Sequence, residues 1–217
     1  MDFAAARRTM VDCQILPNSV TDRRVIDAMS DLPREMFVPS AKQSVAYSDE
    51  SLALGDDRYL MEPMVSARLL ETLELKPTDV ALSIGSGSGY CVALLGRIVD
   101  TVVAVESDTD LAQQAGEHLS GLGIDNVAIV EGPLNKGAAK QAPYDVIFFD
   151  GAVSEVPTAI SEQLAEEGRL VAMIEKPGGI CRAHLMTRYH GVISGRDIFE
   201  ASTPALPGFE RETAFTF

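Results

Sequence analysis

Three glycines on alternate positions, Gly85, Gly87 and Gly89, directly follow the short apolar run Val80–Ile84. A backbone without side chains can approach a ligand closely and can adopt a positive φ, so this strand, its turn and the helix after it predict a ligand-binding crevice. A second apolar run ends at Glu106, about twenty residues further on, where Rossmann-like folds place an acidic side chain that accepts hydrogen bonds from ribose hydroxyls. Together these features predict a site for a ligand that contains a nucleoside.

The spacing of the glycines indicates which nucleoside ligand to expect. The dinucleotide fingerprint G-x-G-x-x-G sets a helix N-terminus against a pyrophosphate. This chain has G-x-G-x-G, which resembles the first motif of S-adenosylmethionine-dependent methyltransferases, where the backbone faces a methionine moiety. We therefore expect S-adenosylmethionine as the cofactor, and NAD is the alternative.

Composition excludes several other classes of protein. The first eight residues contain no apolar run after their basic pair, and no stretch of 18 apolar residues occurs, so we expect a soluble cytoplasmic protein without a membrane partner. Cys13, Cys91 and Cys181 are too few and too scattered for a disulfide framework or a zinc pattern, and we expect no metal site from them. The net charge of −14 disfavours nucleic acid as a partner, because Lys and Arg supply that affinity.

The elements that must position the glycine turn alternate between strand and helix. We expect strands near residues 80–85, 101–106, 126–131, 145–150 and 169–174, with helices near 88–98, 108–121 and 155–166. This alternation predicts a parallel sheet covered on both faces. We expect the tail over residues 190–217 to form a strand pair at the edge of the sheet.

The part of the chain before the glycine turn has a helical pattern. One helix is expected near residues 4–14, a second is expected to begin at Thr21 as its cap, and Pro63 stands where the first turn of a third helix tolerates proline. We interpret residues 1–60 as a helical appendage packed on a catalytic-type domain over residues 61–217. The chain is long enough for one domain with such an elaboration.

Several short segments occur in an order and at a spacing typical of one enzyme family. They are Arg8–Asp12, Val25–Met29, Pro33–Pro39, Ala46–Asp49, Ile84–Tyr90, and Gln163–Leu164 followed by Gly168–Val171. On these segments, most of the chain resembles the protein-L-isoaspartate O-methyltransferase family. The resemblance implies an α/β fold with a doubly wound, mostly parallel, seven-stranded Rossmann-like sheet. It also implies an enzyme that uses S-adenosylmethionine to esterify the α-carboxylate of isoaspartyl residues in damaged proteins.

The resemblance implies a set of cofactor-binding positions in this chain. They are Ser83, Gly85, Ser86, Gly87, Gly89, Glu106, Gly132 and Leu134. At two of these places the chain departs from the family pattern. Ser83 stands where the family has a glutamate that helps to hold the cationic methionine end of the cofactor. Pro133 and Leu134 stand where the family has Asp-Gly, so the side chain that accepts from the adenine amino group is missing.

The acceptor side departs from the family as well. Met61 stands where the family has a hydroxyl residue that faces the acceptor carboxylate, and Glu62 adds a like charge if it faces inward. The acceptor-side candidates are Met61, Glu62 and Asp150, and no catalytic residue is assigned. The changed segment suggests an acceptor other than isoaspartate: a different protein or peptide carboxylate, or a small molecule.

Two competing interpretations remain open. Asp150 ends an apolar strand and resembles the metal-holding aspartate of catechol-type O-methyltransferases, but Glu175 and Lys176 stand where those enzymes have an Asp-Asn pair. A metal site is therefore not expected. The other alternative is a methyltransferase fold with weak or no activity, retained as a binding or scaffold protein, because fold alone does not fix function.

Overall fold

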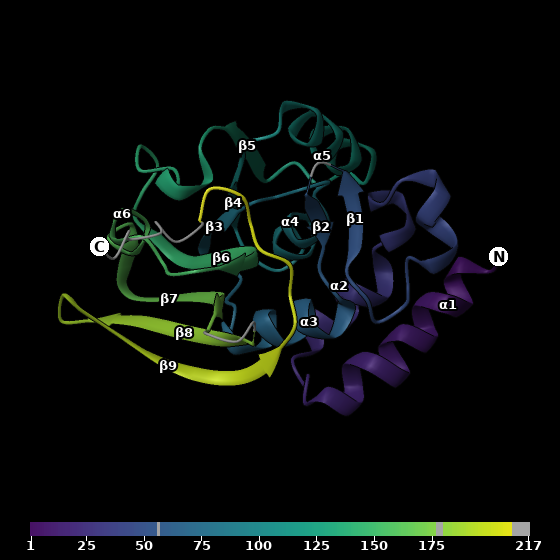
Figure 1. Ribbon diagram of the computed structural model, residues 1–217, viewed down its shortest axis with the longest axis horizontal. Coiled ribbons are helices and arrows are strands. Elements are labelled where there is room, and N and C mark those ends of the chain that lie inside the picture. Colours follow the sequence, from purple (N-terminus) through teal and green to yellow (C-terminus); the bar gives the residue numbers. More distant parts are fainter. Residues whose placement is uncertain (56, 177–179, 210–217) are drawn as a thin grey trace, which may run out of the picture.

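The computed structural model describes residues 1–55, 57–176 and 180–209. Its centre is a seven-stranded sheet in the order β5-β4-β3-β6-β7-β8-β9 (Figure 1). The strands are β3 (Val80–Ile84), β4 (Thr101–Glu106), β5 (Val127–Glu131), β6 (Tyr144–Val153), β7 (Leu164–Glu175), β8 (Cys181–Tyr189) and β9 (Val192–Ala201). Strands β3 to β7 pair in parallel, and β8 and β9 are antiparallel. The predicted fold class, a doubly wound and mostly parallel seven-stranded sheet, is confirmed.

The strand order creates one place where ligands are expected to bind. The chain adds β4 and β5 on one side of β3 and then returns to add β6 on the other side. Ligands of open α/β sheets bind beyond the carboxyl ends of the strands at such a reversal. The glycine turn follows β3, Glu106 ends β4, and Asp150 lies in a bulged part of β6 between Phe148 and Ala152. The topology therefore brings these three predicted site elements to one edge of the sheet.

The two faces of the sheet are covered differently. Buried residues of α3 (Pro63–Thr72), α4 (Tyr90–Gly96) and α5 (Thr109–Gly121) belong to the core on one face. The core on the other face contains Ile160 of α6 (Thr158–Ser161) together with Leu134, Leu206 and Phe209. The helix predicted near 155–166 is wrong in length, because residues from Leu164 onward pair with β6 and this sheet pairing overrides local helix propensity.

The N-terminal part is mainly helical, as predicted, but it also contains a small hairpin. It consists of α1 (Phe3–Met10), a π-helical turn (Val11–Ile15), a 3₁₀ turn (Leu16–Asn18), α2 (Arg23–Asp31), two further 3₁₀ turns (Arg34–Phe37 and Ser40–Val45), and the antiparallel strands β1 (Leu52–Gly55) and β2 (Arg58–Leu60). The hairpin was not predicted from the sequence. It matters for function because β2 carries Arg58 toward the glycine turn.

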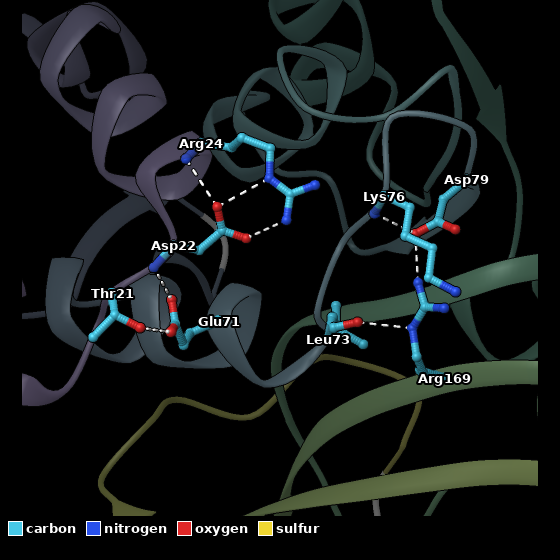
Figure 2. A network of polar contacts seen from close by, with 8 residues as sticks. All are labelled: Thr21, Asp22, Arg24, Glu71, Leu73, Lys76, Asp79 and Arg169. Carbon is cyan, nitrogen blue, oxygen red and sulfur yellow. Dashed lines mark hydrogen bonds and ion pairs between the residues drawn. The ribbon is translucent and has the colours of Figure 1, made fainter.

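The cap of α2 corrects one prediction. Asp22, rather than Thr21, caps the helix, since its carboxylate accepts from the Arg24 backbone N–H at 2.9 Å. Thr21 donates its hydroxyl to Glu71 of α3 at 2.8 Å, and the backbone N–H of Asp22 donates to the same carboxylate at 2.9 Å (Figure 2). Glu71 thus holds the start of α2 in the position where Asp22 is the available cap.

The N-terminal part and the sheet share one hydrophobic core. A single cluster of buried residues includes Met29 of α2, Phe37 and Tyr47, together with Ala104 of β4 and Phe148 of β6. Residues on both sides of the proposed boundary between 60 and 61 therefore belong to one core, and the boundary itself stays a prediction. No helix within the described ranges is long and apolar enough to cross a membrane.

The tail forms a strand pair, but the pair begins earlier than predicted. Strand β8 precedes His190, which lies in the turn of the hairpin. After β9 the chain crosses to β6, where Leu206 N–H donates to Ala152 O at 2.7 Å and Ala152 N–H donates to Pro204 O at 2.9 Å (Figure 1). We call residues 203–209 the C-terminal strap. The part of the predicted tail over residues 210–217 lies outside the described residues.

Candidate active site

The glycine turn is positioned by a backbone hydrogen bond, and its conformation and close neighbours require glycine. Gly85, Gly87 and Gly89 have φ values of +81°, +53° and +100°, which favour glycine. The Gly85 N–H donates to Val105 O of β4 at 2.9 Å. A Cβ atom at Gly89 would lie 3.0 Å from the Cβ of Ala115, so the third glycine allows α4 and α5 to approach each other. The turn is thus positioned by β4 and α5.

Glu106 has the most hydrogen bonds of the predicted site residues. Its carboxylate is fully buried and pairs with both terminal nitrogens of Arg58. Three backbone N–H groups also donate to it, from Gly87 at 2.7 Å, Ser107 at 2.7 Å and Asp108 at 3.0 Å. A carboxylate has roughly four lone-pair sites, so these donors saturate it. Ribose hydroxyls can reach Glu106 only if one of the donors leaves.

Side chains from distant parts of the sequence lie against the glycine turn. A Cβ atom at Gly85 would lie 2.7 Å from Cδ2 of Leu206 and 3.3 Å from Nη2 of Arg58. A Cβ atom at Gly87 would lie 3.1 Å from Cδ1 of Leu54. The crevice predicted beside the turn is therefore filled in this structure by the C-terminal strap and the β1–β2 hairpin.

Asp150 is a buried carboxyl group at the same edge. Burial raises its pKa from an ordinary 3.8 to about 7, against the opposing effects of a hydrogen bond from Cys91 and of the nearby Arg58 and Arg34. Its Oδ1 has no hydrogen-bond partner within residues 1–55, 57–176 and 180–209, and the same holds for the buried hydroxyls of Ser83 and Ser86. These orphaned polar atoms, together with a turn that a Cβ would fill, fit a polar ligand of nucleoside type. They support the predicted cofactor positions without assigning contacts to each.

The remaining cofactor-side candidates lie near the end of β5. The Gly132 N–H donates to the backbone O of Glu106 at 2.9 Å, and a Cβ atom at Gly132 would have no neighbour within 4 Å. Leu134 is buried in the same core cluster as Ile84. The segment is therefore close to the turn and apolar, and its role toward adenine stays a prediction.

The acceptor-side candidates occupy the segment that leads from β2 to α3. The Met61 side chain is buried, and its backbone O accepts from Arg34 at 2.5 Å. Glu62 accepts from the Ser51 hydroxyl at 2.7 Å, and its other oxygen is buried with no partner in the described part of the chain. Glu62 thus points partly inward, as the like-charge interpretation requires, while its effect on an acceptor stays a prediction.

Arg34, in the stretch Pro33–Pro39, connects the N-terminal part to the site through buried contacts. It is fully buried, donates to Ala46 O at 2.7 Å as well as to Met61 O, and lies 4.8 Å from the centre of the Tyr90 ring. Tyr90 is the first residue of α4, directly after the glycine turn. Arg34 therefore joins the N-terminal part to both the cofactor side and the acceptor side.

Arg34, Arg58 and Leu206 are the site residues that sequence reasoning missed. Arg34 lies within a motif that was noted, but only as a mark of resemblance. Arg58 and Leu206 carry no local signal, since each reaches the turn through the fold of a distant segment. A search for a cation able to pair with the buried carboxylate of Glu106 would have limited the candidates to the 18 Lys and Arg residues of the chain, Arg58 among them.

Comparisons with known proteins point to one enzyme family. The family model for protein-L-isoaspartate(D-aspartate) O-methyltransferase matches residues 6–200. The chain is 43% identical over 171 residues to the protein-L-isoaspartate O-methyltransferase of Roseiflexus castenholzii, covering 79% of this chain and 78% of the relative. It is 37% identical over 200 residues to that of Methylorubrum extorquens, covering 92% and 85%.

Solved structures give the same result for the fold. One named protein-L-isoaspartate O-methyltransferase superposes with a TM-score of 0.82 at 30% identity, over 93% of this chain and 66% of the other. A protein-L-isoaspartate O-methyltransferase of Plasmodium falciparum, solved in complex with S-adenosyl-L-homocysteine, superposes with a TM-score of 0.79 at 21% identity, over 95% of this chain and 98% of the other. On the extent of these matches, the chain belongs to the protein-L-isoaspartate(D-aspartate) O-methyltransferase family, whose members are S-adenosylmethionine-dependent methyltransferases.

Proposed function

We propose that this protein transfers a methyl group from S-adenosylmethionine to the α-carboxylate of isoaspartyl residues in proteins and peptides, as a cytoplasmic repair enzyme. The observation that carries the proposal is the buried carboxylate of Glu106 bonded to the amide of Gly87, at the point where the winding of the sheet reverses. The fold thus sets a carboxylate of the kind that binds ribose hydroxyls beside the glycine turn, and a ligand reaches both once a donor to Glu106 and the strap residue Leu206 move aside. Membership of the family supplies the class of acceptor.

The reaction needs alignment more than acid–base chemistry. When bound, the cofactor would supply a methyl group on a cationic sulfur, which leaves as a neutral thioether as the carboxylate oxygen bonds to the methyl carbon. No general base is needed, because the carboxylate is already ionised. The protein's part is to hold both groups in line and to exclude water. The buried glycine turn and the strap residue Leu206 provide an apolar enclosure of that kind. The lack of an assigned catalytic His or Asp is consistent with this chemistry.

The cofactor side is expected to use groups that the fold already positions. Glu106 would accept from the ribose, and the turn at Gly85 and Gly87 would face the methionine part. Asp150 supplies a carboxyl group on the strand next to Ser83, where the family pattern has its own acid. Its orphaned oxygen is suited to the cationic end of the cofactor once the group ionises.

On the acceptor side, Met61 and Glu62 suggest from the sequence a substrate other than isoaspartate. That expectation rests on those altered side chains, and the alternative of an inactive scaffold rests on Ser83 and Pro133 as well. The relatives that match most of the chain are named for isoaspartyl methylation. We therefore take the isoaspartyl carboxylate as the acceptor to test first.

The test is incorporation of a tritiated methyl group into an isoaspartyl peptide, with its aspartyl counterpart as the substrate control. Turnover that depends on the isoaspartyl linkage supports the proposal. Gly87→Val, whose side chain would enter the space of the ligand, is the enzyme control and should abolish transfer. Absence of transfer to the isoaspartyl peptide, with transfer to another carboxylate in the same assay, would refute the proposed acceptor and restore the earlier expectation.

A further inference from the structure

Arg58 is a buried cation that the proposed reaction does not use. It lies on β2, only 3% of its surface is exposed, and both terminal nitrogens donate to Glu106. Two-point pairing of this kind between a guanidinium and a carboxylate is among the strongest side-chain hydrogen bonds in proteins. Arg58 therefore binds Glu106, the residue proposed to accept from the ribose hydroxyls.

The backbone donors to Glu106 cannot give way. The amides of Gly87, Ser107 and Asp108 belong to the glycine turn and to the start of α5, so they stay where the backbone holds them. Of the two side chains that donate to Glu106, Arg58 does so with both terminal nitrogens from the end of a long flexible chain, whereas the Ser107 hydroxyl is a weaker donor at 3.4 Å. Nη2 of Arg58 also lies 3.3 Å from where a Cβ of Gly85 would be, in the space beside the turn.

We propose that Arg58 sets the affinity for the cofactor by competing with its ribose hydroxyls for Glu106. In this structure the guanidinium donates two of the hydrogen bonds to the carboxylate, and the nucleoside binds as Arg58 withdraws. The inference rests on the proposed use of Glu106 for the ribose. Arg58 is a positioning residue in this scheme, because it acts on the cofactor through Glu106.

A displaced guanidinium also needs an anion, because a buried unpaired charge is unfavourable. Asp150 is close enough for the charge of Arg58 to lower its pKa, and its Oδ1 has no partner within the described ranges. The protein therefore contains a second carboxyl group toward which Arg58 can turn. This keeps the exchange of partners inside the site.

The experiment is calorimetric titration of the full-length protein with S-adenosylhomocysteine. Arg58→Met keeps the length of the side chain and removes its charge, so Glu106 becomes free for the ribose, and we expect binding at least about tenfold tighter than in the wild type, or ~1.4 kcal/mol. Arg169→Met is the matched control. Like Arg58, Arg169 pairs with a carboxylate, that of Asp79, but this pair lies beside Leu73 at the opposite end of the strands (Figure 2). Replacement of Arg169 should therefore leave the affinity unchanged.

A second pair of probes isolates the ribose hydroxyls. Adenosine should gain affinity in Arg58→Met, whereas 2′,3′-dideoxyadenosine should gain none, since it has no hydroxyl to donate to Glu106. A role of Arg58 in folding alone would not produce this difference. Should Arg58→Met fail to fold, Arg58→Lys keeps the charge without the two-point pairing, and tighter binding of S-adenosylhomocysteine is again expected.

Two results would overturn the inference. One is equal or weaker binding of S-adenosylhomocysteine by the folded Arg58 variant, and the other is an equal gain for the dideoxy probe. Neither result depends on turnover. A failure of the proposed function would appear differently, as wild-type protein that binds S-adenosylhomocysteine but methylates no isoaspartyl peptide. In a turnover assay the KM for S-adenosylmethionine should fall in the variant more than kcat changes.

Discussion

Among single residues, Arg58 and Glu106 depend on each other most. Removing one member of a buried pair leaves the other charge unpaired, which typically costs about 3–5 kcal/mol. We expect a double-mutant cycle of Arg58→Met and Glu106→Gln, measured by urea unfolding without ligand, to give an interaction energy on the order of 1–3 kcal/mol. Strictly additive changes in the free energy of unfolding would show that the pair does not stabilise the fold.

Asp150 should make the stability of the protein depend on pH. Burial raises its pKa from 3.8 to about 7, so the folded state favours the protonated form. Its contribution is fully present below the unfolded pKa and is lost as pH rises toward and through about 7. Asp150→Asn, which stays neutral, should therefore be more stable than the wild type at pH 8.5, by on the order of 3 kcal/mol.

The same comparison at low pH provides the control for Asp150. At pH 4 the wild-type carboxyl is already protonated in the folded state, so the two proteins should unfold at similar urea concentrations. An advantage of Asp150→Asn that is equal at both pH values would point to altered packing instead of ionisation. Measurements with S-adenosylhomocysteine absent keep ligand binding out of the result.

At the scale of elements, the junction of α2 and α3 shows how one helix places another. Asp22 caps α2 and accepts two hydrogen bonds from the Arg24 side chain, at 3.0 and 2.5 Å, which lower the pKa of Asp22 (Figure 2). Asp22→Ala should lower the free energy of unfolding by about 1 kcal/mol, within the range of about 0.5–2 kcal/mol for lost caps. Asp22→Ser keeps a capping oxygen and should recover most of this. An equal loss in both variants would assign the effect to the Arg24 contact.

Elements were predictable where the local pattern and the long-range fold agree. The strands β3 and β4 lie within a residue of their predicted bounds, because continuous runs of apolar residues suit strands buried on both faces. The helix predicted near 155–166 is only the single turn α6 in the structure, because Leu164 pairs with Tyr144 and the chain from there on belongs to the sheet. The choice between Thr21 and Asp22 as a cap was decided by Glu71, which is distant in the sequence.

The candidate site was predictable to the same extent. The glycine turn, Glu106 and Asp150 belong to β3, β4 and β6, which are neighbours in the sheet, and parallel strands bring their carboxyl ends to one edge. Arg58 and Leu206 belong to a short hairpin and to a segment after the last strand. Their position against Gly85 results from side chains packing across the whole fold, and no periodicity or motif in their own segments records it.

At the scale of the whole molecule, the shared core predicts cooperative unfolding. Buried residues of α2 and of the sheet belong to one cluster, so neither part buries its apolar surface without the other. We expect amide hydrogens of α2 and of β3 to exchange with the same opening free energy in native-state hydrogen exchange. A markedly lower value for α2 would instead support an appendage that opens independently of the sheet. The urea dependence of both groups of amides provides the check on global unfolding.

The position of Leu206 has a consequence for the timing of catalysis. The strap residue lies against Gly85 and is held by its backbone bond to Ala152, so we expect a nucleoside to enter or leave the proposed site only when that segment lifts. Opening therefore precedes both arrival of the methyl donor and departure of the demethylated product, and one structural event limits two kinetic steps. We expect the observed rate of association to level off at high ligand concentration, at the rate of opening. We also expect release of the product, and not methyl transfer, to limit turnover, as in many enzymes with a closing segment.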